Sequence, residues 1–245
     1  MSGPPLRATY RLQFRNGITF AHAAEAAPRL AAAGISHLYA SPIFRAVGGS
    51  THGYDVADHN AFEPSLGGEA GFRAMSAALR ANGLGLILDI VPNHMAAHPD
   101  NPWWRDVLRL GPASPYARHF DIDWGAEKLV LPVLGRHYGD ALAAGDIQRV
   151  VKDDHTTVLQ IPGQELPLSP GTEDIADVNT CHEAQHYRLA HWRIARDGLT
   201  YRRFFEIAGL VGVRVEDPAV FDDVHRLTVR LIEDGHVCGL RVDHV

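Results

Sequence analysis

L-G-L-I-L-D-I-V, residues 84–91, is a continuous apolar run interrupted only by Asp89. A run of this kind fits a parallel strand that is buried on both faces of a sheet. The preceding residues, Glu69–Asn82, favour a helix, and Gly83 supplies the left-handed residue that commonly ends one. Residues 69–91 therefore predict a helix that returns the chain to a buried parallel strand.

The same rhythm precedes this unit. Thr9–Phe14 reads T-Y-R-L-Q-F and alternates as a strand does, and Ser36–Ala40 is a second short apolar run. Between them, Phe20–Ala33 is rich in alanine, begins after the potential cap Thr19 and stops at Gly34. A strand–helix–strand order with parallel strands is typical of an α/β protein with right-handed crossovers.

The rhythm returns near the end of the chain. Asp217–Asp234 predicts an amphipathic helix with Pro218 in its first turn, and Gly235 ends it. His236–Val242 then reads as a fourth strand. The apolar positions of this helix step by three and four residues: Val220, Val224, Leu227 and Leu231.

Two stretches break the pattern. Residues 41–68 predict a polar, glycine-rich loop, and residues 95–200 lose the regular alternation, apart from a helix expected near Glu183–Arg196. We expect an α/β fold, the N-terminal half of a (β/α)₈ TIM barrel with an inserted subdomain after the third strand. Residues 1–94 would begin the barrel, 95–200 would form the insertion, and 201–245 would continue the barrel to its fourth strand.

Four strands are half of what such a barrel needs, and an open half sheet exposes a buried strand as an edge. The sequence therefore predicts a fragment. A complete four-stranded doubly wound domain is the alternative.

Composition restricts the partners. The formal charge is -6 and no block of basic residues occurs, which argues against nucleic acid or an anionic membrane as partner. No apolar run is long enough to span a bilayer, and no signal peptide is recognisable, so a cytoplasmic location is expected. Cys181 and Cys238 are far apart in the sequence and are expected to be free thiols, although a single bridge between them stays open.

Functional groups gather where two predicted strands end. One end reads D-I-V-P-N-H, residues 89–94, and the other G-L-R-V-D-H, residues 239–244. Arg241 and Asp243 are two residues apart, so their side chains point the same way. An arginine keeps a neighbouring carboxylate ionised, as a carboxylate nucleophile requires, although a structural salt bridge is the alternative.

These two motifs, with Gly53-Tyr54-Asp55-Val56 between them, resemble the α-amylase family of glycoside hydrolases and transglycosylases. The resemblance implies that Asp243 is the catalytic nucleophile and that Arg241 orients it. It implies that Tyr54 stacks beneath the sugar before the scissile bond and that His94 binds its hydroxyls. Further positions would shape and hold the substrate site: Asp89, Asn93, Asp55 and His244.

Within that family, several runs resemble the maltooligosyl trehalose synthases, among them A-T-Y-R-L-Q-F at 8–14 and Y-R-R-F-F at 201–205. This implies a maltooligosaccharide substrate whose reducing-end α-1,4 link becomes an α,α-1,1 link through a retaining, covalent glycosyl-enzyme mechanism. A trehalose-releasing hydrolase is the implied functional partner. The general acid of the family lies on a later strand, so residues 1–245 alone are expected to be inactive. No cofactor or metal is expected, although Asn93 matches a calcium-ligand position of some amylases.

Other functions stay open. An α-1,4-glucan hydrolase would use the same carboxylates. His182-Glu183-Ala184-Gln185-His186 fits H-E-x-x-H, a zinc metalloprotease signature when it lies on a helix. A non-catalytic glycan-binding protein would use aromatic faces such as those of Trp103, Trp104 and Trp124, which more often pack inside a subdomain.

Overall fold

The computed structural model describes residues 4–244, and it divides into two compact units. The first unit comprises residues 1–95 and 215–245, and the second comprises residues 96–214. The second unit is therefore inserted into the chain of the first. Each unit has its own sheets and its own buried side chains, and each is described by itself.

The first unit is built on the four predicted strands. They are β1 (Thr9–Leu12), β2 (His37–Ala40), β5 (Gly85–Ile90) and β14 (Gly239–Val242), and they pair in the order β1-β2-β5-β14. All three pairings are parallel. The carboxyl ends of the strands consequently meet at one edge of the sheet, as they do in open α/β folds.

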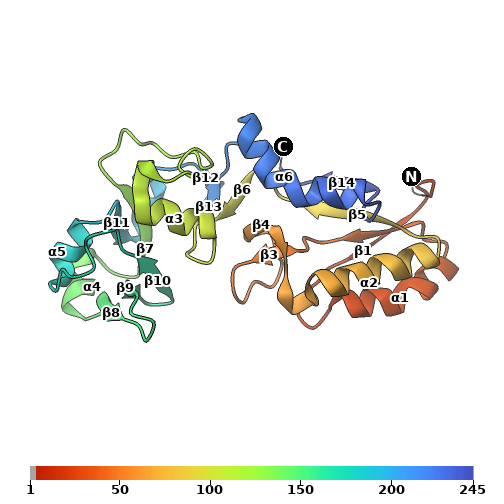
Figure 1. The fold of residues 1–245 in the computed structure, drawn as a ribbon, viewed down its shortest axis with the longest axis horizontal. Coiled ribbons are helices and arrows are strands. Elements are labelled where there is room, and N and C mark those ends of the chain that lie inside the picture. The colour runs from red at the N-terminus through yellow and green to blue at the C-terminus, as the bar shows by residue number, and fades with distance from the viewer. Residues whose placement is uncertain (1–3, 245) are drawn as a thin grey trace. The chain divides into compact units, whose positions relative to one another are not determined.

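Three long helices belong to this unit: α1 (Phe20–Ala32), α2 (Gly68–Ala81) and α6 (Pro218–Glu233). Helices α1 and α2 lie side by side (Figure 1). Thr19 is the N-cap of α1, as predicted, and its N–H donates to the His22 ring. At the start of α6 the Asp217 carboxylate accepts the Ala219 N–H at 3.0 Å. Three glycines with positive φ follow these helices, as the sequence predicted: Gly34, Gly83 and Gly235.

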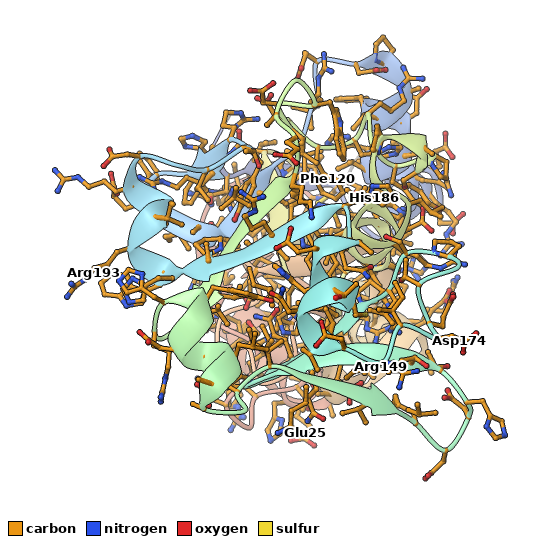
Figure 2. The ribbon with its side chains drawn as sticks, turned by 90° about the vertical axis from the view of Figure 1, so that its left-hand side faces the viewer. Glu25, Phe120, Arg149, Asp174, His186 and Arg193 are labelled. Carbon is orange, nitrogen blue, oxygen red and sulfur yellow. The ribbon has the colours of Figure 1, made fainter. Side chains whose placement is uncertain are left out.

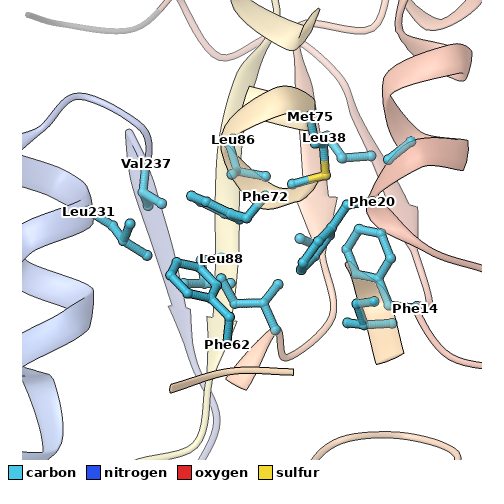
Figure 3. Close-up of a cluster of buried hydrophobic side chains, with 14 of the residues drawn as sticks. Phe14, Phe20, Leu38, Phe62, Phe72, Met75, Leu86, Leu88, Leu231 and Val237 are labelled. Carbon is cyan, nitrogen blue, oxygen red and sulfur yellow. The ribbon is translucent and has the colours of Figure 1, made fainter. Parts of the chain in front are cut away.

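A cluster of aromatic rings forms the centre of the core (Figure 3). Phe20 meets Phe14 edge to face at 5.1 Å and Phe72 at 5.9 Å, and Phe62 lies 4.9 Å from Phe72. These side chains come from four separate segments of the chain and are 0–9 % exposed. Burying each ring contributes about 2–3 kcal/mol, so the cluster fixes the helices against the sheet.

The loop expected over residues 41–68 contains an antiparallel pair, β3 (Phe44–Ala46) and β4 (Val56–Phe62), followed by the 3₁₀ turn η1 (Pro64–Leu66). That expectation was wrong because the polar residues of β4 have buried partners. The Asn60 side-chain amide donates to the Asp223 carbonyl and accepts the Leu227 N–H. An α-helix normally pairs those two backbone groups with each other. The Asn60 side chain therefore binds both members of one such backbone pair in α6.

The second unit consists of short strands and helices around its own core. Parallel strands β7 (Leu129–Leu134) and β11 (Tyr187–His191) pair, and an antiparallel sheet has the order β10-β9-β8. Phe120 lies in the crowded interior, whereas Arg193 extends outward (Figure 2). The remaining elements are β8 (Gln148–Val151), β9 (Thr157–Ile161), β10 (Gln164–Pro167), β12 (Arg203–Phe204), β13 (Ile207–Gly212), α3 (Pro102–Leu110), η2 (Gly111–Ala113), α4 (Tyr138–Ala143), α5 (Val178–Glu183) and η3 (Trp192–Arg196).

The two ends of the second unit lie close together, because the Ala97 N–H donates to the Gly209 carbonyl at 2.8 Å. Residues 201–214, which we expected to continue the barrel, are part of this unit and form β12 and β13. In the sequence, strand β6 (His94–Ala96) lies at the point where the chain passes from the first unit to the second.

The prediction of a helix near Glu183–Arg196 was wrong. Helix α5 ends at Glu183, and the chain then forms β11. Tyr187 and Leu189 are buried while Arg188 is exposed, which is the period of a strand rather than a helix.

Both cysteines are free thiols, as expected. Among the helices of residues 4–244, none combines the length and the apolar character needed to cross a membrane.

Candidate active site

Asp89 is the centre of the polar network at the carboxyl edge of the sheet. It lies near the end of β5 and is 0 % exposed. Its Oδ2 accepts the hydroxyl groups of Tyr54 at 2.7 Å and Tyr39 at 3.0 Å, and its Oδ1 accepts Arg241 Nη1 at 2.9 Å. A buried carboxylate needs such partners. Asp89 is therefore held as a fixed negative charge that orients three other side chains.

Arg241 connects this buried charge to a more exposed one. On β14 its Nη1 lies 2.6 Å from Asp243 Oδ1 as well as 2.9 Å from Asp89. The Asp243 side chain is 25 % exposed. The hydrogen bond to Asp89, followed by attraction to both carboxylates, raises the pKa of Arg241. Asp243 is thus paired with a permanent cation, while part of its surface is open to a ligand.

Tyr54 lies between Asp89 and a second arginine. Its hydroxyl donates to Asp89 and accepts from Arg11 Nη2 at 3.0 Å. Burial, together with the hydrogen bond to Asp89, raises the pKa of Tyr54 to about 12. The phenol hydroxyl is fully engaged and neutral at physiological pH. The ring of Tyr54 thereby has one defined orientation.

Asp55 belongs to the adjoining loop. Its carboxylate accepts the Ser50 hydroxyl and lies 3.7 Å from the His52 ring, and the same Ser50 oxygen accepts the Gly53 N–H at 3.0 Å. The Tyr54 N–H also donates to His52, at 3.0 Å. In this structure Asp55 fixes the loop that carries Tyr54.

The remaining predicted residues adjoin the strand ends. His94 is 1 % exposed, and its Nδ1 lies 3.3 Å from the Asn93 amide. His244 follows β14 with a φ of 55°. The structure thus brings together Asp89, Tyr54, Arg241 and Asp243 through named contacts. Asn93 lies three residues beyond the end of β5, His94 begins β6, and His244 lies two residues beyond the end of β14.

Sequence reasoning missed Arg11 and Tyr39. They are register partners on β1 and β2, and the Arg11 guanidinium also lies over the Tyr39 ring at 5.5 Å. Tyr39 in turn pairs with Ile87, two residues before Asp89, so these side chains share a face of the sheet. Counting strand positions back from each carboxyl end would have found both.

The sequence of this chain is similar to known proteins over most of its length. Residues 27–245 match the family described as "Alpha amylase, catalytic domain". The chain belongs to the α-amylase family. An intracellular maltogenic amylase of Bacillus subtilis is 35 % identical over 89 residues, which cover 36 % of this α-amylase-family chain and 14 % of that protein.

This α-amylase-family chain is homologous to the maltooligosyl trehalose synthases. It is 45 % identical to a Mycobacterium tuberculosis protein provisionally named as one, over 98 % of this chain and 31 % of that protein. A solved maltooligosyltrehalose synthase from Arthrobacter ramosus superposes with a TM-score of 0.88 at 43 % identity, over 97 % of this chain and 31 % of the other. The chain therefore spans about a third of the length of the relatives it matches.

The hypothesis that His182–His186 forms a zinc-protease site was wrong. His182 lies on α5, but the helix ends at Glu183, before His186. His182 Nε2 accepts the Leu189 N–H at 3.0 Å, and burial lowers the pKa of His182 to about 4. Within residues 4–244, no group of three or more His, Cys, Asp and Glu side chains is arranged to hold a metal ion.

The three tryptophans considered as sugar-binding residues pack within the second unit. Trp104 is 1 % exposed, Trp103 stacks on Tyr116 at 5.5 Å, and Trp124 Nε1 donates to the Ala117 carbonyl at 3.4 Å. These contacts agree with the packing role that such residues more often have.

Proposed function

We propose that this chain forms the first half of the (β/α)₈ catalytic barrel of a maltooligosaccharide-converting enzyme, with the second unit as its inserted subdomain. The reaction is an intramolecular transglucosylation that turns the reducing-end α-1,4 linkage into an α,α-1,1 linkage. The observation that carries this proposal is Arg241, which joins a buried aspartate to a partly open one at the carboxyl edge of the sheet. Homology to the maltooligosyl trehalose synthases supports the choice of substrate.

The proposed chemistry starts at Asp243. One of its carboxylate oxygens attacks the anomeric carbon of the sugar before the scissile bond, and the bond from that carbon to the reducing-end glucose breaks. A general acid gives its proton to the departing oxygen. The freed glucose then attacks the same carbon through its own anomeric hydroxyl, whose proton returns to the acid, and Asp243 is released. Two inversions at one carbon retain its configuration.

The neighbouring residues orient these groups. Arg241 orients Asp243, since its Nη1 lies 2.6 Å from Asp243 Oδ1. Asp89 holds Arg241 and Tyr54, and the Tyr54 ring supports the sugar. The family resemblance assigns the binding of sugar hydroxyls to His94, which is 1 % exposed in residues 4–244. The substrate site is shaped by Asn93, Asp55 and His244.

Asp89 is unsuited to be the general acid because it already accepts three hydrogen bonds and is fully buried. Because the chain spans about a third of the length of its relatives, we propose that residues 1–245 alone show no turnover. Measurable conversion of a maltooligosaccharide by this chain alone would overturn that expectation.

The deciding experiment is a reducing-end count on maltopentaose incubated with the natural protein that carries this chain. A fall in reducing ends with little free glucose supports the intramolecular conversion. A rise means hydrolysis, which would leave Asp243 as nucleophile and replace the proposal with an α-1,4-glucan hydrolase. Binding of the glucan with no change in reducing ends would indicate a non-catalytic glycan-binding protein.

A cytoplasmic location and a partner enzyme complete the proposal. The product would carry a trehalose unit at one end, so a hydrolase that releases trehalose is the expected next enzyme. Coupled assay of both proteins would show free trehalose only when both are present.

A further inference from the structure

Arg15, which follows β1, is a buried cation. Its side chain is 3 % exposed, and its guanidinium donates to the Pro42 carbonyl at 2.9 Å and the Phe44 carbonyl at 3.1 Å. Glu63 Oε2 lies 3.4 Å from Nη2. Burial lowers the pKa of Arg15, while Glu63 and Asp55 act in the opposite direction. The guanidinium is therefore tied on several sides and has little freedom to move.

The same guanidinium lies directly against the backbone of Gly53. A Cβ at Gly53 would collide with Arg15 Nη1 and lie 2.6 Å from its Cζ. Gly53 also has a φ of 81°, which a residue with a side chain rarely adopts. Gly53 immediately precedes Tyr54, whose hydroxyl binds Asp89. Arg15 thus supports the backbone at the point where the ring of Tyr54 leaves the loop.

Glu63 extends this support to the other side of the loop. Its Oε2 accepts the Ala46 N–H at 3.1 Å, and its Oε1 accepts the Ser65 hydroxyl at 2.8 Å. The Val47 N–H donates to the Asp55 carbonyl at 3.2 Å and so closes the loop after β3. The ion pair between Arg15 and Glu63 consequently contacts the loop of residues 47–55 in two places, at Ala46 just before it and at Gly53 within it.

We propose that Arg15 is a positioning residue for the substrate site: with Glu63 it fixes Gly53, and through Gly53 it sets the place of the Tyr54 ring. Arg15 itself is buried and acts only through the loop. The consequence for turnover rests on the proposed function, whereas the consequence for Tyr54 does not. Two separate measurements can therefore test them.

The first measurement is the phenol titration of Tyr54, which needs no enzymatic activity. For each protein compared, it is the difference in absorbance near 295 nm between that protein and the same protein carrying Tyr54→Phe. In Arg15→Lys, which keeps the charge but cannot reach the same three acceptors, Tyr54 loosens from Asp89. Its pKa then falls from about 12 towards the ordinary value of 10. Arg136→Lys, at a surface ion pair with Asp146, is the matched control and leaves the titration unchanged.

Gly53→Ala tests the same contact from the other side, and it serves if Arg15→Lys does not fold. The added methyl group pushes the loop from the guanidinium, so the pKa of Tyr54 falls in this variant as well. Near-ultraviolet circular dichroism identifies the variants that fold. An unchanged Tyr54 titration in the folded variants overturns the proposal.

The second measurement is a double-mutant cycle on kcat/KM. Arg15→Lys lowers kcat/KM about tenfold in the presence of Tyr54, since misplacement of a substrate-positioning group by about 1 Å is costly. In a Tyr54→Ala background the same substitution changes kcat/KM less than about twofold, because the group it positions is gone. Equal losses in both backgrounds would mean general damage and would overturn the proposal. If no activity of the proposed kind exists, the titration still decides the role of Arg15.

Discussion

Arg241 and Asp89 are register partners on neighbouring parallel strands, and their side chains form a 2.9 Å hydrogen bond across the sheet. Residues paired in this way project to the same face. Asp243, two residues further along β14, projects to that face as well and meets the same Nη1. The sheet register therefore brings Asp89, from the first motif, to the Arg241 guanidinium of the second motif, which Asp243 also contacts.

Replacement of Asp243 by Asn should remove catalysis and spare binding. The amide cannot act as the nucleophile, so kcat of the natural protein should fall by more than about 10³-fold. Isothermal titration with maltopentaose should still show binding. Asp222→Asn, at an exposed position on α6, is the control and should retain full turnover. Retention of turnover by the Asp243 variant would place the nucleophile elsewhere.

Asp89→Asn should loosen the whole network. The buried charge that holds Arg241 would be lost, at a cost of roughly 2 kcal/mol of stability. This figure is below that of a fully buried pair because the Arg241 side chain is 44 % exposed. Urea unfolding monitored by far-ultraviolet circular dichroism gives the free energy. The pKa of Tyr54 should also fall below about 12, since Asp89 contributes to raising it.

His59 should make the protein less stable in acid. It is 1 % exposed, and burial, with repulsion from His225 and His94, lowers its pKa from 6.5 to about 3. The folded state favours the neutral ring, so the contribution of His59 to the free energy of unfolding is fully present above a pH of about 6.5. That contribution is lost as the pH falls from about 6.5 towards 3, with a slope of up to about 1.4 kcal/mol per pH unit.

The check is the free energy of unfolding measured between pH 7 and pH 4. His59→Gln should reduce the slope by about one proton, and the exposed His155→Asn should leave it unchanged. His182, whose pKa is lowered to about 4, supplies a second proton in the same range that both variants retain. Equal slopes for the wild type and His59→Gln would contradict the assignment.

Asn101→Ala should destabilise the second unit. Asn101 is 0 % exposed, and its Oδ1 accepts the N–H groups of Trp103 and Trp104 at the start of α3. Loss of this cap, with the buried N–H groups left unpaired, should cost about 2 kcal/mol. Tryptophan fluorescence during urea unfolding reports on this unit. Asn179→Ala, at an exposed contact with Tyr138, should cost much less.

The sequence was sufficient for the parts of the fold that depend on local periodicity. The four parallel strands, the glycines after the helices and the cap at Thr19 follow from patterns within a few residues. Strand β4 was missed because its polar residues serve distant partners: Asn60 binds α6, 163 positions away, and His59 is buried. No local pattern contains that information.

The grouping of side chains at the carboxyl edge of the sheet could be predicted only in part. Arg241 and Asp243 follow from spacing along one strand, and Tyr54 from a family motif. Arg11 and Tyr39 were missed because their contacts depend on the register of β1 and β2. Strand β11 was taken for a helix because its partner β7 could not be recognised in the sequence.

The hydrogen bond between Ala97 and Gly209 bears on the order in which the chain folds. Strand β5 ends at Ile90 and its neighbour β14 begins at Gly239, so an unfolded insertion would make their pairing a long loop closure. Once the second unit has folded, its two ends are tied together and the effective loop is much shorter. The insertion should therefore fold first, and the Asp89–Arg241 contact should be among the last to form.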